Sequence, residues 1–200
     1  VAPVIEAISD LGVPISVDTA SARVAGAALD AGADWINDVT ALADPEMGSL
    51  AAARGCPVVL MHMRGEPRTM QRDVQYTDLV SEVVDYLRDR GRYAESLGIP
   101  QQNVILDPGI GFGKRPEHNL ELLRAVSRLV DTGYAVLVGA SRKSFLGACF
   151  GLEPSERRSG SVAAALAAAA GGAHVVRVHD VKATRRAVDV FCGIAAARGL

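Results

Sequence analysis

An arginine and a histidine lie two residues apart in the apolar run HVVRVH (174–179). Side chains at positions i and i+2 of a β-strand share one face, so Arg177 and His179 point to one place if this run is a strand. Two hydrogen-bond donors placed together suit a phosphate or diphosphate. The alternative is an exposed arginine beside a helix-capping histidine. Because both side chains interrupt an otherwise apolar strand, we favour the anion site.

Three acceptor side chains, Asp18, Asn37 and Asp107, each follow a different apolar run. A carboxylate accepts two parallel hydrogen bonds, so this group could bind the edge of a ring that carries several N–H donors. The same side chains could instead bind Mg²⁺ or cap helices. Of the three residues, Asp107 fits the role of a helix cap least well, because Pro108 and a glycine-rich loop follow it.

A lysine lies in the segment VGASRKSFLG (138–147). Gly139 and Lys143 share a face if strand geometry persists, and Gly139 leaves room for a flat ligand to approach the backbone. Lys143 could contact an acceptor oxygen or an anion, or it could form a Schiff base with a carbonyl carbon. The last possibility makes a class I aldolase an alternative, and a lysine that merely caps a helix is another.

Two further segments carry side chains of interest. The loop DPGIGFGK (107–114) matches neither phosphate-binding glycine motif, and its Phe112 could either cover a planar substrate or plug the core. His62, in MHMRGEPRTMQ (61–71), has no second soft ligand at useful spacing, which favours a structural histidine over a metal ligand. Met61 is a candidate for a flexible apolar wall of the pocket.

Short apolar runs and helical segments alternate along the whole chain. The runs are rich in β-branched residues and do not alternate in polarity, which predicts strands buried on both faces: 14–19, 35–39, 57–62, 103–108, 134–141 and 174–179. Helices are expected between and after them, at 22–31, 78–97, 118–130, 161–170 and 181–197. A glycine that can end a helix precedes each run: Gly12, Gly32, Gly55, Gly98, Gly133 and Gly172.

This alternation predicts an α/β fold with a parallel sheet and right-handed crossovers. Polar residues at the ends of nearly all strands favour a (β/α)8 TIM barrel over an open doubly wound sheet. A closed barrel needs eight strands, so we expect an incomplete barrel with six of them, in a single domain over residues 1–200. The chain opens inside an amphipathic helical pattern without an initiator Met, which indicates a fragment whose missing strands precede Val1. The first and last strands should then face a gap and not each other.

Composition excludes several classes of function. A formal net charge of -2 gives no general attraction to nucleic acid or to an anionic membrane. No run reaches the ~18 apolar residues that a membrane-spanning helix needs. Three widely spaced cysteines indicate free thiols in a reducing cytoplasm.

Six motifs together resemble the dihydropteroate synthase family in their order and spacing. They are ISVDT (15–19), INDV (36–39), VVLMHMRGEPRTMQ (58–71), ILDPGIGFGK (105–114), VGASRKSFLG (138–147) and VRVHDV (176–181). The resemblance covers almost the whole chain and is most specific for the last three. It implies a transferase of folate biosynthesis that joins 6-hydroxymethyl-7,8-dihydropterin diphosphate to 4-aminobenzoate, releasing diphosphate and 7,8-dihydropteroate.

The resemblance also implies roles for individual residues. The pterin would be held by Asp18, Asn37, Asp107 and Lys143, with Met61 and Gly139 lining its slot. Arg177 and His179 would hold the diphosphate and, with Lys143, form the catalytic group. The aminobenzoate site, which is also where sulfonamides bind, would be bordered by Phe112, Lys143 and Ser144. The family further suggests a homodimer through the later helices and Mg²⁺ as cofactor.

Two segments typical of the family are not found in this sequence: an Asn that contacts diphosphate and Mg²⁺, and a Thr-Arg-Pro loop. We therefore expect the 200-residue chain alone to be inactive and to contribute no metal ligand. A pterin-binding methyltransferase domain is the alternative enzyme, although the VRVHDV motif argues against it. A non-catalytic fragment that binds a pterin is the third hypothesis.

Overall fold

The computed structural model describes residues 1–65, 70 and 74–197. Within them, six parallel strands form one sheet whose order in space is their order in the chain. Their bounds are β1 Ser16–Asp18, β2 Trp35–Asp38, β3 Val58–Met61, β4 Val104–Asp107, β5 Ala135–Val138 and β6 Val175–Val176. All six expected strands are therefore confirmed, each shorter than its apolar run. Part of the 58–71 motif lies outside the described residues.

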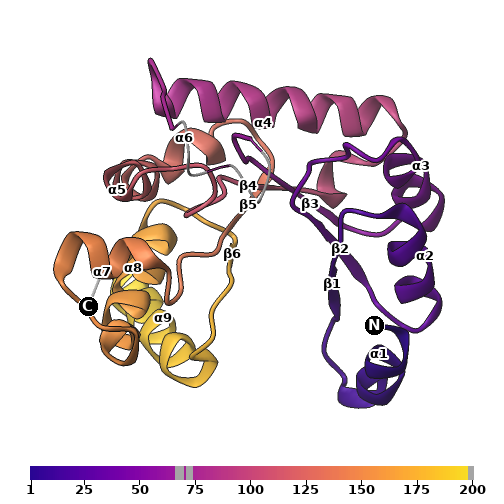
Figure 1. Ribbon diagram of the computed structural model, residues 1–200. Helices are drawn as coiled ribbons and strands as arrows, with labels where there is room; N and C mark the ends of the chain where they lie inside the picture. Colours follow the sequence, from indigo (N-terminus) through magenta and orange to yellow (C-terminus); the bar gives the residue numbers. More distant parts are fainter. Residues whose placement is uncertain (66–69, 71–73, 198–200) are drawn as a thin grey trace.

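Helices connect the strands and cover the outer side of the curled sheet (Figure 1). Their bounds are α1 Ala2–Ile8, α2 Ala22–Asp30, α3 Pro45–Arg54, α4 Leu79–Ser96, α5 Pro116–Arg124, α6 Val126–Val130, α7 Ser144–Phe150, α8 Arg157–Ala170 and α9 Val181–Ala196. Short 3-10 turns occur at Ser9–Leu11, Gln101–Asn103 and Pro154–Glu156. The glycines expected to end helices all have positive φ: Gly12, Gly32, Gly55, Gly98, Gly133 and Gly172.

The prediction of a single helix at 118–130 is wrong. The structure divides it into α5 and α6, because Ala125 leaves helical geometry with φ -97 and ψ 14. Leu122 and Leu123 before the break, and Val126 and Leu129 after it, are all buried. Bending the chain at Ala125 lets both segments bury their apolar side chains, and this gain outweighs continuous helical hydrogen bonding.

Two separate clusters of apolar side chains use the two faces of the strands. The outward face packs against the helices in a large core that includes Ile36, Leu60 and Leu106. The inward face forms a small cluster of Val59, Ile105 and Leu137, with Trp35, Ala135 and Val175 packed against it. Alternating side chains thus separate the helix-packing core from the interior of the barrel.

β1 and β6 are the two edges of the sheet. The six strands therefore form a curled, open part of an α/β barrel, as the sequence predicts (Figure 1). No helix within the described residues is long and apolar enough to cross a membrane.

Candidate active site

A pocket of about 380 Å³ lies where the C-terminal ends of β1, β5 and β6 approach one another. It is lined by Asp18, Gly139, Ser141, Lys143, Arg177, Val178 and His179. A second cavity of about 460 Å³ shares Asp18 and Arg177 with it and extends inward over Trp35, Asn37 and Leu137. Most of the polar strand ends singled out in the sequence thus line two adjoining hollows, whereas Asp107 is not among their lining residues.

Asp18 and Asn37 lie side by side because β1 and β2 pair in register at these two residues. The Asn37 Nδ2 donates to Asp18 Oδ2 at 2.9 Å. Arg177 Nη1 approaches the same Asp18 oxygen at 3.6 Å, although β1 and β6 form no backbone ladder. The expected gap between these two strands is therefore present in their backbones, but this ion pair spans the distance between them.

Asp107 lies at the end of β4 and is 2% exposed. Its Oδ1 accepts a hydrogen bond from the Gly109 backbone N–H at 2.7 Å. Burial raises the pKa of Asp107, while this hydrogen bond and three nearby cations oppose the rise. Met61 pairs in register with Asp107 on the neighbouring strand and is fully buried beneath the loop after β4, and its contact with a ligand stays a prediction.

Lys143 precedes the first turn of α7 and extends toward the loop after β4. Its Nζ donates to the carbonyl oxygen of Ile110 and lies 4.4 Å from the centroid of the Phe112 ring. Burial lowers the pKa of Lys143 to about 8, with Asp107 raising it and Arg177 lowering it further. Phe112 therefore covers the lysine amine, is only half-buried, and its contact with a planar substrate stays a prediction.

Lys114 is a buried cation whose importance the sequence does not reveal. It is 3% exposed, and its Nζ lies 3.0 Å from His62 Nδ1 and donates to the Phe112 carbonyl at 3.0 Å. Burial lowers the pKa of Lys114 to about 7, against the opposing effect of Asp107. Burial and the Lys114 charge lower the pKa of His62 to about 3, so this imidazole is neutral at pH 7. His62 is thus a structural partner of the loop after β4.

Arg177 and His179 follow β6 and line the same pocket. A Cβ added at Gly139 would lie 3.1 Å from Arg177 Nε. Glycine at this position therefore leaves room for the Arg177 guanidinium. Ser141 Oγ lies 3.0 Å from His179 Nδ1. Ser144 is exposed at the start of α7, one residue beyond Lys143.

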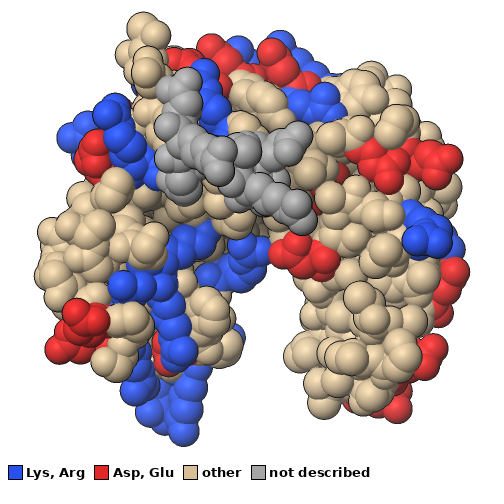
Figure 2. All heavy atoms as spheres, in the orientation of Figure 1, with Lys and Arg blue, Asp and Glu red and all other residues tan. Residues whose placement is uncertain are grey.

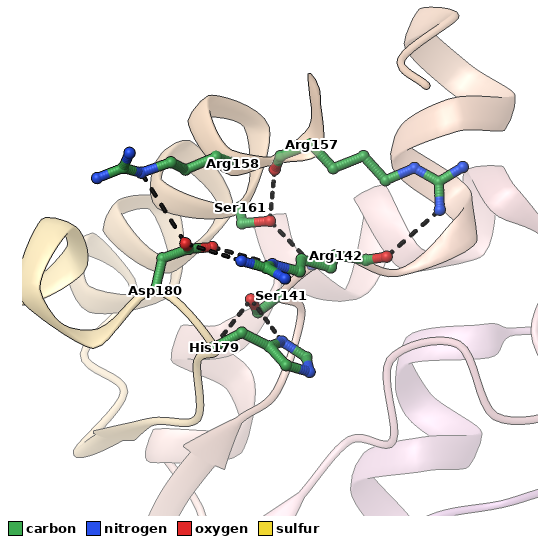
Figure 3. Close-up of polar contacts among 7 residues, drawn as sticks. All are labelled: Ser141, Arg142, Arg157, Arg158, Ser161, His179 and Asp180. Carbon is green, nitrogen blue, oxygen red and sulfur yellow. Dashed lines mark hydrogen bonds and ion pairs between the residues drawn. The ribbon is translucent and has the colours of Figure 1, made fainter. Parts of the chain in front are cut away.

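Sequence patterns do not single out two further residues that lie beside this pocket. Arg142 donates to both carboxylate oxygens of Asp180, at 2.9 and 3.1 Å (Figure 3). They are 38 positions apart, so no local pattern could have indicated the contact. Figure 2 shows Lys and Arg side chains gathered on the wall of the central hollow that carries α7 to α9, facing a wall with few of them.

A metal centre finds no support among the residues that the structure describes. They contain no group of three or more His, Cys, Asp or Glu side chains that could hold an ion. Asp18, the carboxylate most open to the pocket, is already engaged by Asn37 and Arg177. These side chains alone therefore do not fit a Mg²⁺ site.

Comparison with known proteins agrees with this geometry. Residues 1–179 match the family described as pterin binding enzyme. The chain is 50% identical over 190 residues to a probable bifunctional folylpolyglutamate synthase/dihydropteroate synthase of Haloferax volcanii, covering 95% of this chain and 23% of that protein. It is 44% identical over 191 residues to the dihydropteroate synthase of Escherichia coli, covering 95% of this chain and 68% of the enzyme.

Solved structures give the same result. The dihydropteroate synthase of Thermus thermophilus in complex with 6HMPPP superposes with a TM-score of 0.92 at 49% identity, over 96% of this chain and 77% of that one. The same enzyme in complex with 4-aminobenzoate superposes with a TM-score of 0.91 at the same identity, over 96% of this chain and 74% of that one. The chain spans about a quarter of the bifunctional relative and about two thirds of the single-function one. Sequence, fold and site together place this chain in the dihydropteroate synthase family of pterin-binding enzymes.

Proposed function

We propose that this chain forms most of the pterin and diphosphate sites of an enzyme that makes 7,8-dihydropteroate. One observation carries the proposal: acceptors suited to a ring edge, Asp18 and Asn37, and cations suited to a diphosphate line two adjoining hollows. The hollows meet at Asp18 and Arg177, whose Nη1 lies 3.6 Å from Asp18. A ligand that carries both an N–H-rich ring and a diphosphate would satisfy both groups at once. The relative from Thermus thermophilus, solved with 6HMPPP, supports this choice.

The reaction needs little covalent chemistry from the protein. The bond between the exocyclic methylene carbon and the diphosphate oxygen breaks, and its electron pair leaves with the diphosphate. The resulting cation is conjugated with the pterin ring. The amine nitrogen of 4-aminobenzoate then forms the new C–N bond and loses a proton. Catalysis therefore consists mainly of placing the reactants and stabilising charge as it develops.

The described side chains suit these tasks. Arg177 and His179 stabilise the negative charge on the leaving diphosphate. Asp107 accepts hydrogen bonds from the ring edge, and Asp18 and Asn37 add acceptors and a donor near the ring. Lys143, with a pKa of about 8, is mostly protonated at pH 7 and donates to an acceptor oxygen. Phe112 and Ser144 border the aminobenzoate.

Magnesium is proposed as the cofactor from family resemblance alone. When bound it would neutralise charge on the diphosphate. Because the described side chains do not form a metal cluster, no step here depends on it. Binding of the pterin diphosphate to residues 1–200, measured at equilibrium with and without Mg²⁺, tests whether these residues contribute to the metal site. Binding that does not depend on Mg²⁺ is expected if the ligands lie outside them, and a large dependence would show that residues 1–200 supply a metal ligand.

A pterin-binding methyltransferase domain is the competing function. It would need the ring acceptors but would have no diphosphate to place beside Arg177 and His179. The decisive experiment measures binding of 6-hydroxymethyl-7,8-dihydropterin with and without its diphosphate, and then dihydropteroate formation from the diphosphate and 4-aminobenzoate. Both should be run on residues 1–200 and on the longest chain that the gene encodes. Equal affinity for the two pterins, with no product from the longer chain, would refute the proposed function.

The same proposal includes a homodimer in the cytoplasm. An apolar groove of about 540 Å³ lies between α5, α7 and α8, beside Phe150, which is 59% exposed. A second copy of the chain packing on this groove would cover Phe150. Phe150→Glu should therefore shift the protein from dimer to monomer in analytical ultracentrifugation.

The cysteines Cys56, Cys149 and Cys192 are free thiols, which supports a reducing compartment.

A further inference from the structure

The segments after β5 and β6 are tied together by two neighbouring contacts (Figure 3). Ser141 Oγ accepts from the His179 backbone N–H at 3.2 Å and lies 3.0 Å from His179 Nδ1. One residue further along both segments, Arg142 Nε and Nη2 donate to the two carboxylate oxygens of Asp180. We call these four residues, Ser141, Arg142, His179 and Asp180, the clamp.

The arginine of the clamp has an unusual backbone that α8 holds in place. Arg142 has a φ of +58, a left-handed conformation that a residue with a side chain rarely adopts. Its backbone N–H donates to Ser161 Oγ at 2.8 Å, and Ser161 in turn donates to the Arg157 carbonyl at 2.5 Å. Arg157 Nη1 donates to the Arg142 carbonyl at 3.4 Å. These hydrogen bonds fix the backbone of Arg142, and so they fix the position from which its side chain extends.

The segment that carries Arg177 and His179 has few other constraints. β6 contains two residues and pairs with β5 on one side, and the Arg177 N–H donates to the Val138 carbonyl at 3.0 Å. The side chains of Arg177 and His179 are exposed, so packing does not set their directions. The clamp supplies the constraint that the short strand lacks, immediately beside Lys143.

We propose that Arg142 and Asp180 are positioning residues that hold Arg177 and His179 in place to receive the diphosphate. This inference rests on the proposed function and adds to it. Ser141 Oγ holds His179 at two points, the backbone N–H and Nδ1, so the direction of the imidazole ring is set. The proposal includes the tautomer in which Ser141 donates to Nδ1, because that tautomer leaves an N–H at Nε2 for the anion.

A matched control lies on α9, the helix that begins immediately after Asp180. Arg185 Nε donates to both oxygens of Asp189 at 2.8 and 3.0 Å, in an exposed pair four residues apart on α9. Both pairs join an arginine to two oxygens of an aspartate, but the Arg185 pair connects one turn of a helix to the next. Asp189→Asn therefore removes an equivalent charge contact without freeing a segment of the site.

The experiment compares Asp180→Asn, Arg142→Gly and Asp189→Asn in the longest chain that the gene encodes. Binding of the dihydropterin with and without diphosphate is measured by calorimetry. For the first two variants we expect the dissociation constant of the diphosphate form to rise about five- to tenfold, as the loss of one charge-assisted contact implies. The dissociation constant of the pterin without diphosphate should stay within about twofold, and Asp189→Asn should change neither.

Two features protect this test from a folding defect. Glycine adopts the left-handed conformation of residue 142 freely, so Arg142→Gly keeps the turn and removes the contact. Within the described part of α9, the Asp180 side chain makes no capping hydrogen bond, so Asp180→Asn costs the helix no cap. A dissociation constant of the diphosphate form that stays within about twofold of the wild type in both variants, or equal weakening of both ligands, overturns the clamp alone. A wild-type protein without that preference overturns the proposed function and the clamp with it.

Discussion

The centre of the sheet and its β6 edge position polar side chains by opposite means. At the centre, Asp107 and Lys114 are almost fully buried, and fixed hydrogen bonds hold each of them. At the edge, Arg177 and His179 are exposed, and ion pairs and a hydroxyl contact hold them. Burial thus fixes the side chains of the proposed ring site, whereas charge pairs fix those of the proposed diphosphate site. Changes at the centre should therefore be costly and general, and changes at the edge smaller and ligand-specific.

The loop after β4 should give the largest effect. Gly109 has a φ of +67, and a Cβ there would lie 1.9 Å from the His62 carbonyl oxygen. Gly151 has a φ of +69 but has open space where a Cβ would go. Backbone strain alone should make Gly151→Ala cost about 1–2 kcal/mol. Gly109→Ala adds a clash with backbone and should cost about 4 kcal/mol or more. Urea unfolding measures both, and equal losses would show that the centre is not rigid.

Asp107→Ala tests the ring site directly. It removes a buried acceptor and leaves the nearby lysines without its charge, so binding of the dihydropterin should weaken by about 1.5–3 kcal/mol. The loss should be the same whether or not the pterin carries diphosphate. Calorimetry with both ligands measures it. A loss confined to the diphosphate form would assign Asp107 to the anion site instead.

Lys114→Met should change the pH dependence of stability. The unfolded chain keeps the Lys114 proton up to its ordinary pKa of 10.5, whereas burial lowers the folded pKa to about 7. The unfolded state therefore binds more protons between these values, and the free energy of unfolding of the wild type should rise with pH relative to the variant. The difference should grow by up to about 1.4 kcal/mol per pH unit above pH 7. Urea unfolding of both proteins from pH 6 to 9 measures it, and parallel curves would contradict the burial of a titrating amine.

Arg177→Ala should have the smallest effect of the four. Its side chain is 41% exposed, so solvent and salt weaken its interaction with an anion. Binding of the pterin diphosphate should weaken by about 1 kcal/mol, and binding of the pterin without diphosphate should not change. The loss should shrink as salt is added. Equal losses for both ligands would refute the anion role and remove the contrast between centre and edge.

The sequence predicts the inner face of the barrel well, because strand parity is a local property. It predicts that Asp18, Asn37 and Arg177 meet at one end of the strands, and they do. Their roles toward a substrate remain predictions. The burial of Lys114 could not be predicted, because lysine is usually exposed and nothing beside it in the sequence marks an interior position. The Arg142–Asp180 contact depends on the relative placement of two strands, which no local pattern encodes.

The two faces of each strand have different consequences for how such a protein can evolve. Inward side chains contact the hollow, and outward side chains hold the helices in place. A substitution at Leu137 or Val175 alters the shape of the hollow, whereas one at Val136 or Val138 alters helix packing. Ligand preference can therefore change most freely at the partly exposed inward position Val175. Leu137 is buried against Val59 and Ile105, so a change there alters both the hollow and the stability of the fold.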